Sequence, residues 1–230
     1  MIDLRSAGDR GIHVVLSAAG VPDPATILRT RELAARLRAA AIPGVTECVP
    51  GYESVLVVYD GVAVNPAAVR AAVAACAVAP ASAPARVRAT VSPTPVPVCV
   101  CPACALDRDE AVARLGRPWP AIVAAFCAAP YAVWLRGFQP GFPFLGPLPA
   151  GLALPRLPSP RPRVPAGSVG IGGMQAGIYA TSGPGGWRIL GRTNLVLFDP
   201  RRNPPVLFTP GAAVRFEPGE DHAAFHFAER

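Results

Sequence analysis

Hydrophobic and polar residues alternate along the first ninety positions in a pattern that predicts four strands and two helices. Leu33 and Leu37 repeat at the four-residue spacing of a helix face, and Asp23 followed by proline is a favourable helix start. Asn65, again before a proline, starts the second predicted helix. The order strand, helix, strand, strand, helix, strand is that of a split βαβ sandwich. The predicted strands are apolar runs at residues 11–16, 45–49, 54–59 and 86–91.

The following residues predict a boundary and then a different kind of fold. Ser92–Pro97 has a proline at every second position from Pro93, which is typical of a semi-rigid linker. Two short helices are predicted at 107–115 and 119–127. Beyond Gly137 glycines and prolines separate short apolar runs, the pattern of a β-barrel or sandwich, and strands are predicted at 169–171, 188–190, 195–198, 206–208 and 214–216. We therefore predict an α+β protein with one domain at 1–91, a linker at 92–97 and a second domain at 98–230.

Charge narrows the possible functions. The chain carries 22 basic and 15 acidic residues, a net charge of +7, and every basic residue is arginine. Walker-type phosphate loops, Schiff-base enzymes and kinases need a lysine, so this chain alone belongs to none of these classes. The arginines form no continuous basic run, which argues against a nucleic-acid partner. No apolar stretch reaches the ~18 residues of a membrane span and no signal-peptide pattern is present, so we expect a cytoplasmic protein without a membrane partner.

Three of the six cysteines form the densest local motif, Cys99-Val-Cys101-Pro-Ala-Cys104. A structural zinc site needs four ligands, whereas a redox Cys-x-x-Cys pair usually starts a helix after a strand. Cys101 and Cys104 have the redox spacing, and His222 and His226 have the spacing of a zinc half-site. Both functions are alternatives. However, the other cysteines are remote in sequence and the histidines lie in an acidic, aromatic tail, so we predict no metal site and no fourth ligand beside the cysteines.

Arginines and glycines supply the remaining chemical signal in the second half of the chain. Guanidinium groups bind carboxylates and phosphates through paired hydrogen bonds, and glycine lets a ligand approach the backbone closely. The sequence pattern identifies no Ser-His-Asp or Cys-His triad, since histidines are scarce. The residues alone indicate an anion-binding β-barrel that is not a complete enzyme. The arginines concerned are Arg156, Arg161, Arg163, Arg188 and Arg192.

A series of longer motifs points to one protein family more specifically than the short patterns above. Their residues, order and spacing closely resemble the B subunit of bacterial 5-oxoprolinase, whose family is also called KipI or allophanate hydrolase subunit 1. The resemblance covers roughly the whole chain and is strongest from residue 135 to 218. The motifs are Trp134–Leu145, Arg161–Gly172, Gln175–Tyr179, Pro184–Trp187 and Ile189–Thr193.

The resemblance implies a ferredoxin-like N-terminal domain and a cyclophilin-like C-terminal barrel. It also implies a component of an ATP-dependent complex that opens 5-oxo-L-proline to L-glutamate, with the A and C subunits of 5-oxoprolinase as separate partner chains. ATP, with magnesium, would be bound largely by those partners, and no cofactor is expected within this chain alone. The family also contains an inhibitor of a histidine kinase and relatives within urea-metabolising carboxylases. A KipI-type regulator or an allophanate hydrolase-related subunit is therefore the alternative function.

Site residues follow from this interpretation. Arg163 and Arg192 would bind the substrate carboxylate or a phosphorylated intermediate, and Gln175 and Tyr179 would hydrogen-bond the lactam or its oxyanion as the catalytic pair. Phe138, Phe142 and Trp187 would form the pocket walls and exclude water. Gly185 and Gly186 would let the backbone approach the substrate. The chain departs from the family pattern at several positions: residues 100–104 replace a Tyr-Gly-Gly loop, and single substitutions are found at Phe126, Ala176 and Ala180.

Overall fold

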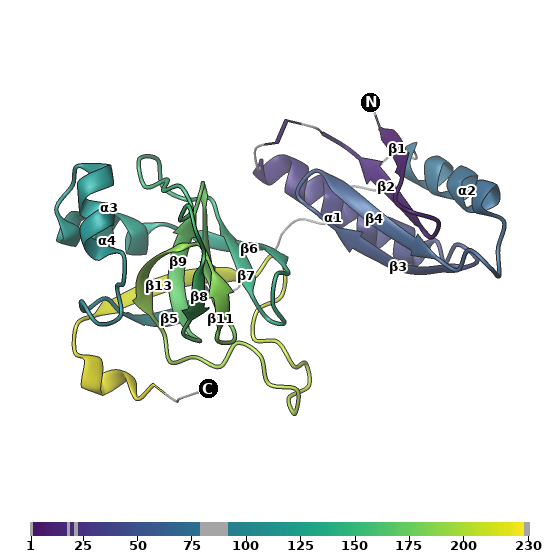
Figure 1. Ribbon diagram of the computed structural model, residues 1–230. Coiled ribbons are helices and arrows are strands. Elements are labelled where there is room, and N and C mark those ends of the chain that lie inside the picture. The colour runs from purple at the N-terminus through teal and green to yellow at the C-terminus, as the bar shows by residue number, and fades with distance from the viewer. Residues whose placement is uncertain (1, 18, 21–22, 79–91, 228–230) are drawn as a thin grey trace. The chain divides into compact units, whose positions relative to one another are not determined.

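The computed structural model describes residues 2–17, 19–20, 23–78 and 92–227, and the chain divides into two units, residues 1–87 and 88–230 (Figure 1). The first unit contains a four-stranded antiparallel sheet of order β1-β2-β4-β3 and two helices. Helix α1 packs against β3, β4 and α2. The elements are β1 (Asp3–Ser6), β2 (Gly11–Val15), α1 (Pro24–Ala39), β3 (Val45–Pro50), β4 (Ser54–Tyr59) and α2 (Pro66–Val78).

The predicted helix start is confirmed. The Thr26 backbone N–H donates to Asp23 Oδ2 over 2.8 Å, which satisfies one of the N–H groups left unpaired at a helix N-terminus. Leu33 and Leu37 are each 1% exposed, so the four-residue repeat does form the buried face of α1. The second helix likewise buries Val69 on the core of this unit.

The strand order of the first unit corrects the prediction at one edge of the sheet. The sequence did not predict β1, which pairs antiparallel with β2 through partners such as Leu4 and Val14. In a split βαβ sandwich the last strand pairs beside the first, so β1 occupies the edge that the predicted strand at 86–91 would take. The predicted strand itself lies outside the described residues.

The second unit is built on a closed barrel of order β10-β7-β6-β13-β5-β12-β9, and β8 and β11 pair as a separate ribbon (Figure 1). The α+β class with a C-terminal barrel is confirmed. The predicted strands at 195–198 and 206–208 are wrong, because these segments form only one isolated bridge, Phe198 with Val206. The elements are β5 (Thr94–Cys99), α3 (Arg108–Leu115), α4 (Trp119–Ala128), β6 (Tyr131–Arg136), β7 (Pro143–Gly146), β8 (Arg161–Val164), β9 (Ser168–Gly172), β10 (Gln175–Ile178), β11 (Gly183–Gly185), β12 (Arg188–Arg192), β13 (Ala213–Gly219) and the 3₁₀ helix η1 (His222–Phe225).

The predicted linker at 92–97 is wrong for residues 94–97, which belong to β5. This strand runs parallel to β13, from the Thr94–Val214 pair to the Cys99–Gly219 pair. Side chains alternate between the two faces of a strand, so the valines (Val96 and Val98) face the barrel core while the intervening prolines face outward. On its other side β5 pairs with β12 only at Cys99. The prolines, which lack a backbone N–H, therefore interrupt no hydrogen bonds between β5 and β12.

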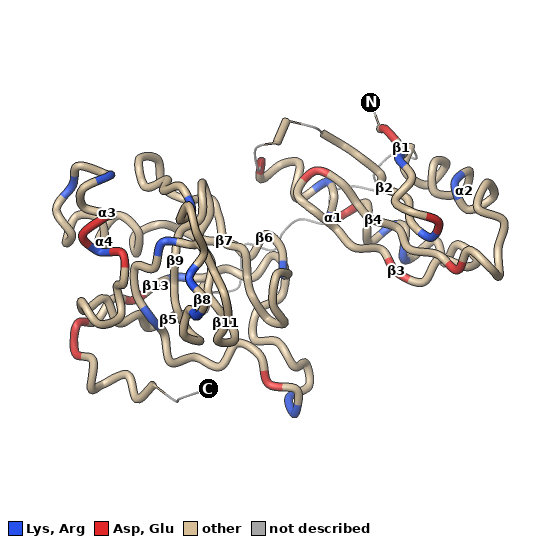
Figure 2. The backbone as a smooth tube through the Cα atoms, in the orientation of Figure 1, with Lys and Arg blue, Asp and Glu red and all other residues tan. Residues whose placement is uncertain are grey.

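Charge is distributed over both units. Arginine positions, blue in Figure 2, are spread along the elements of each unit rather than gathered in one run. Among the residues described, none of the helices combines the length and the apolar character needed to cross a bilayer.

Candidate functional site: an aromatic pocket on the barrel

A pocket of about 400 Å³ opens on the barrel unit, and we call it the aromatic pocket. This volume lies within the range of small-molecule sites. Five aromatic rings form most of its wall, together with one guanidinium group and the backbone of two consecutive glycines. The lining residues are Phe138, Phe142, Phe144, Arg156, Leu157, Pro160, Tyr179, Pro184, Gly185, Gly186 and Trp187.

The aromatic rings hold one another through edge contacts. The centre of Phe142 lies 5.4 Å from both Tyr179 and Trp187 at near-perpendicular angles, the arrangement that the ring quadrupoles favour. Phe138 extends this set from the turn before β7 and stays 62% exposed at the pocket mouth. Its backbone φ is 65°, a left-handed conformation that is uncommon outside glycine and costs energy. The fold thus keeps an exposed phenyl ring in a strained turn beside the pocket.

Tyr179 supplies a neutral hydroxyl at the pocket wall. Burial raises the pKa of the phenol, although the Trp187 backbone N–H and the charges of Arg156 and Arg161 act in the opposite direction. The phenol therefore keeps its proton at neutral pH and can donate it in a hydrogen bond. Within the described residues, its oxygen is buried and forms no hydrogen bond of normal geometry. A ligand in the aromatic pocket is a natural partner for this group.

Arg156 supplies the charge. Its guanidinium carbon lies 5.7 Å from the centre of the Trp187 ring, a cation–π distance that orients the planar group at the pocket. Such a group can bind a carboxylate or phosphate through two parallel hydrogen bonds. None of the lining residues, all of them described in the structure, is a carboxylate, thiol or imidazole. The pocket is therefore equipped to bind and orient an anionic ligand rather than to supply a nucleophile and its base.

A buried ion cluster fixes two walls of the pocket. Asp107 is 4% exposed and accepts two hydrogen bonds from Arg161, of 3.1 and 2.7 Å, and one of 2.6 Å from the Ile189 backbone N–H. Arg188 is 1% exposed, pairs with Glu110 and lies 3.7 Å from Asp107. These contacts join the start of α3 to β8 and β12. The two strands begin directly after Pro160 and Trp187, which line the pocket.

The comparison with known families covers most of this architecture. The family model for the carboxyltransferase domain, subdomains C and D, matches residues 2–208. The chain belongs to this family.

Curated and solved relatives agree with the match. The chain is 50% identical over 118 residues to the 5-oxoprolinase B subunit of Escherichia coli O157:H7, a match covering 46% of this chain and 54% of the relative. It is 55% identical over 86 residues to the 5-oxoprolinase B subunit of Bacillus subtilis, covering 37% and 36%. The matches thus span about half or less of these relatives. The solved structure of TTHA0988 is 34% identical, with a TM-score of 0.76 over 92% of this chain and 40% of that one. The resemblance to the B subunit of 5-oxoprolinase is confirmed.

Six of the nine predicted site residues line the aromatic pocket, and three do not. Gln175 is buried at the start of β10, where it pairs in register with Gly172. Arg163 donates to Ser182 Oγ over 3.0 Å from an exposed position. Arg192 donates to the Ala166 carbonyl over 2.8 Å. The roles given to these three remain predictions, but the structure does not bring them into the pocket. The six that line it are Phe138, Phe142, Tyr179, Gly185, Gly186 and Trp187.

Sequence reasoning missed several lining residues. Arg156 belonged to the arginine series, but no spacing singled it out from its neighbours. Phe144 falls inside the Trp134–Leu145 motif, so the family resemblance was a signal that could have identified it. Leu157 and Pro160 lie in an irregular segment, where no periodicity reports which side chains turn inward.

Gly185→Ala is expected to disrupt the aromatic pocket, whereas Gly186→Ala is not. A Cβ atom at position 185 would lie 2.7 Å from Cζ of Tyr179 and closer still to its hydroxyl, so the buried ring would have to move. At position 186 the nearest atoms are 3.8 Å away, an ordinary contact. Overpacking of this kind costs about 1–3 kcal/mol. Denaturant unfolding followed by tryptophan fluorescence measures the difference, and equal stability of the two variants would contradict the packing described here.

Proposed function

We propose that this chain is the B-type subunit of a cytoplasmic, ATP-dependent 5-oxoprolinase, which converts 5-oxo-L-proline to L-glutamate. The observation that carries the proposal is an aromatic pocket with one guanidinium group and one neutral phenol, in a chain 50–55% identical over the matched segments to proteins named as the B subunit of 5-oxoprolinase. A five-membered lactam is small and flat and carries one carboxylate. Aromatic walls suit the ring, and Arg156 suits the carboxylate.

Tyr179 has the chemistry to act on the other end of such a substrate. Hydrolysis of a lactam places negative charge on the carbonyl oxygen, and a preorganised neutral donor stabilises that charge in a site that excludes water. The buried Tyr179 hydroxyl is such a donor. In this proposal Tyr179 donates a hydrogen bond to the lactam oxygen, and Phe138 at the pocket mouth helps to exclude water.

The missing chemistry must come from partner chains. The chain has no lysine for a phosphate-binding loop, and the aromatic pocket holds no nucleophile–base pair. We therefore propose that the A and C subunits of 5-oxoprolinase bind ATP with magnesium and complete the site beside the pocket. The pocket described here would be one side of a shared active site.

Reconstitution tests this function. The purified chain alone should release no glutamate from 5-oxo-L-proline, and a mixture with the A and C subunits of the same genome should release it only when ATP is present. The Escherichia coli relative in place of this chain serves as the positive control. If the relative gives activity and this chain does not, the enzyme function is wrong and the KipI-type regulator becomes the better interpretation. Activity from this chain alone would contradict the shared site.

A further inference from the structure

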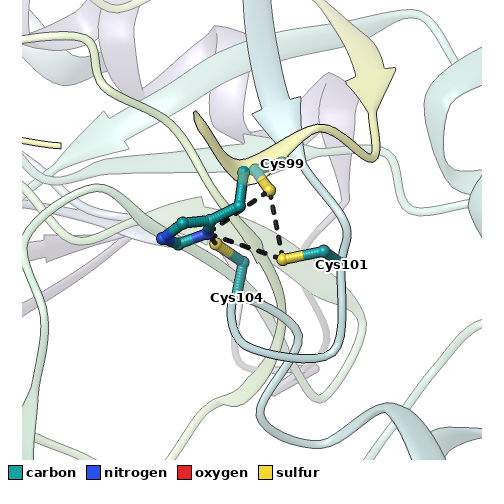
Figure 3. A group of neighbouring side chains, drawn as sticks. Cys99, Cys101 and Cys104 are labelled. Atoms are coloured by element: carbon teal, nitrogen blue, oxygen red, sulfur yellow. Dashed lines mark hydrogen bonds between the residues drawn. The ribbon is translucent and has the colours of Figure 1, made fainter. Parts of the chain in front are cut away.

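Four metal-binding side chains meet where β5 and β13 end, and none of them lines the aromatic pocket. They are Cys99, Cys101, Cys104 and His222, and their ligand atoms all lie within 4.8 Å of one another (Figure 3). The Cys99 and Cys101 sulfurs are 3.4 Å apart. His222 Nδ1 lies 4.0, 3.6 and 3.4 Å from the sulfurs of Cys99, Cys101 and Cys104.

The parallel pairing of β5 and β13 creates this cluster. Cys99 stands opposite Gly219 in the register, and the Val100 backbone N–H donates to the Gly219 carbonyl over 2.9 Å. Because parallel strands end at the same side of a sheet, the segments that follow them leave the barrel together. Those segments carry Cys101 and Cys104 after β5, and His222 after β13. The prediction that no fourth ligand accompanies the cysteines is therefore wrong.

Local hydrogen bonds define the backbone on both sides of the cluster. The Cys104 and Ala105 backbone N–H groups donate to the Cys101 carbonyl over 3.0 and 2.9 Å, which closes a tight turn around the Cys-x-x-Cys pair. On the other side, the Asp221 carboxylate caps η1 by accepting a 3.0 Å hydrogen bond from the Ala223 N–H. His222 is the first residue of that short helix, so both halves of the cluster have a defined backbone.

The dimensions fit a tetrahedral metal site. With Zn–S bonds of about 2.3 Å and Zn–N bonds of about 2.0–2.1 Å, tetrahedral angles require ligand separations of about 3.8 Å between sulfurs and about 3.6 Å between sulfur and nitrogen. The four separations given above, 3.4 Å between the Cys99 and Cys101 sulfurs and 4.0, 3.6 and 3.4 Å from His222 Nδ1, lie close to these values, and all the ligand atoms are within 4.8 Å of one another. A disulfide needs about 2.05 Å between sulfurs, so the 3.4 Å contact between Cys99 and Cys101 is not one.

We propose that Cys99, Cys101, Cys104 and His222 bind one zinc ion in a structural Cys₃His site. Thiolates and imidazole are the ligands of structural zinc sites, and four protein ligands leave no position open for a substrate. Cys99 and Cys104 are buried, and Phe225 packs against them. The ion would fasten the C-terminal segment to the barrel.

The fastened segment reaches a candidate anion-binding side chain. Phe227 packs against the same cluster, and the Arg192 guanidinium lies 4.4 Å from the centre of its ring. Arg192 is also paired in register with Cys99 across β12 and β5. Zinc binding would therefore order the segment that carries Phe227, and with it the aromatic ring that contacts the Arg192 guanidinium.

Metal analysis of the full chain tests the proposal. After purification with zinc present and thiols kept reduced, then desalting, elemental analysis should find one zinc per chain. Replacement by cobalt(II) should give the strong ligand-field bands of tetrahedral coordination together with thiolate-to-cobalt charge-transfer absorption. Cys104→Ser and His222→Ala should lose the stoichiometric zinc. Cys127→Ser, which changes a thiol of the same unit outside the cluster, should keep it.

Thiol reactivity in the wild-type protein makes the test independent of how the variants fold. Zinc should protect three of the six thiols from a thiol-specific reagent, and a strong chelator should release that protection. The proposal is overturned if the wild-type chain binds no stoichiometric zinc, or if Cys104→Ser retains as much as Cys127→Ser. It is equally overturned if peptide mapping of zinc-supplemented protein finds a Cys101–Cys104 disulfide, which would indicate a redox pair.

Discussion

Asp107→Ala should lower the free energy of unfolding of the barrel unit by about 3–5 kcal/mol, the cost of removing one partner from a buried ion pair. Asp107 is the acceptor of three hydrogen bonds from Arg161 and the Ile189 N–H, and it lies beside the fully buried Arg188. Its loss leaves the buried Ile189 N–H unpaired and an excess of positive charge between α3 and β12. Asp107→Asn should cost less, because the amide oxygen can still accept the Ile189 hydrogen bond.

Tryptophan fluorescence in a denaturant titration isolates this effect. All three tryptophans, Trp119, Trp134 and Trp187, belong to the second unit, so their signal reports its unfolding and not that of the first unit. Asp109→Ala is the matched control, since Asp109 is an exposed carboxylate in the first turn of α3, the helix that Asp107 precedes. A loss of stability no larger for Asp107→Ala than for this control would show that the cluster does not hold α3 on the barrel.

The sequence predicted best those elements that are determined by interactions between residues close together in the chain. Asp23 before Pro24 and the repeat of Leu33 and Leu37 identified α1, because capping and helix periodicity act within one or two turns. The glycine-rich short runs likewise indicated a barrel. The family resemblance then identified most of the aromatic rings of the pocket, since its motifs include the turn before β7 and the strands around Trp187.

Long-range pairing set the limits of that prediction. Ser92–Pro97 reads as a linker by composition, yet β13, more than a hundred residues later, supplies the partner strand that makes 94–99 part of the barrel. The same pairing brings His222 to the cysteines. Asp107 and Arg161 are 54 positions apart, and nothing in either local sequence reports their contact. In each case the deciding interaction joins residues whose distance depends on the completed barrel.

Arg156→Ala should lower kcat/KM of the reconstituted enzyme by about 10–100-fold, because a charge-assisted hydrogen bond to a substrate carboxylate contributes about 1.5–3 kcal/mol. This prediction rests on the proposed function. Arg156 is the one guanidinium among the residues that line the aromatic pocket. Arg156→Lys should recover only part of the loss, because an ammonium group keeps the charge but not the planar fork or the stacking on Trp187.

Two further arginine variants test whether the substrate carboxylate binds Arg156 in the aromatic pocket or Arg163, which the sequence predicted. Arg163 was predicted to bind the substrate, but it is exposed and hydrogen-bonded to Ser182. Arg201 is 88% exposed and paired with Asp199, and its removal should leave the rate unchanged. If Arg156 binds the carboxylate, Arg156→Ala should cost far more than Arg163→Ala, while all three variants keep the tryptophan unfolding transition of the wild type. The reverse order would place the anion site at Arg163 on β8 and not in the aromatic pocket.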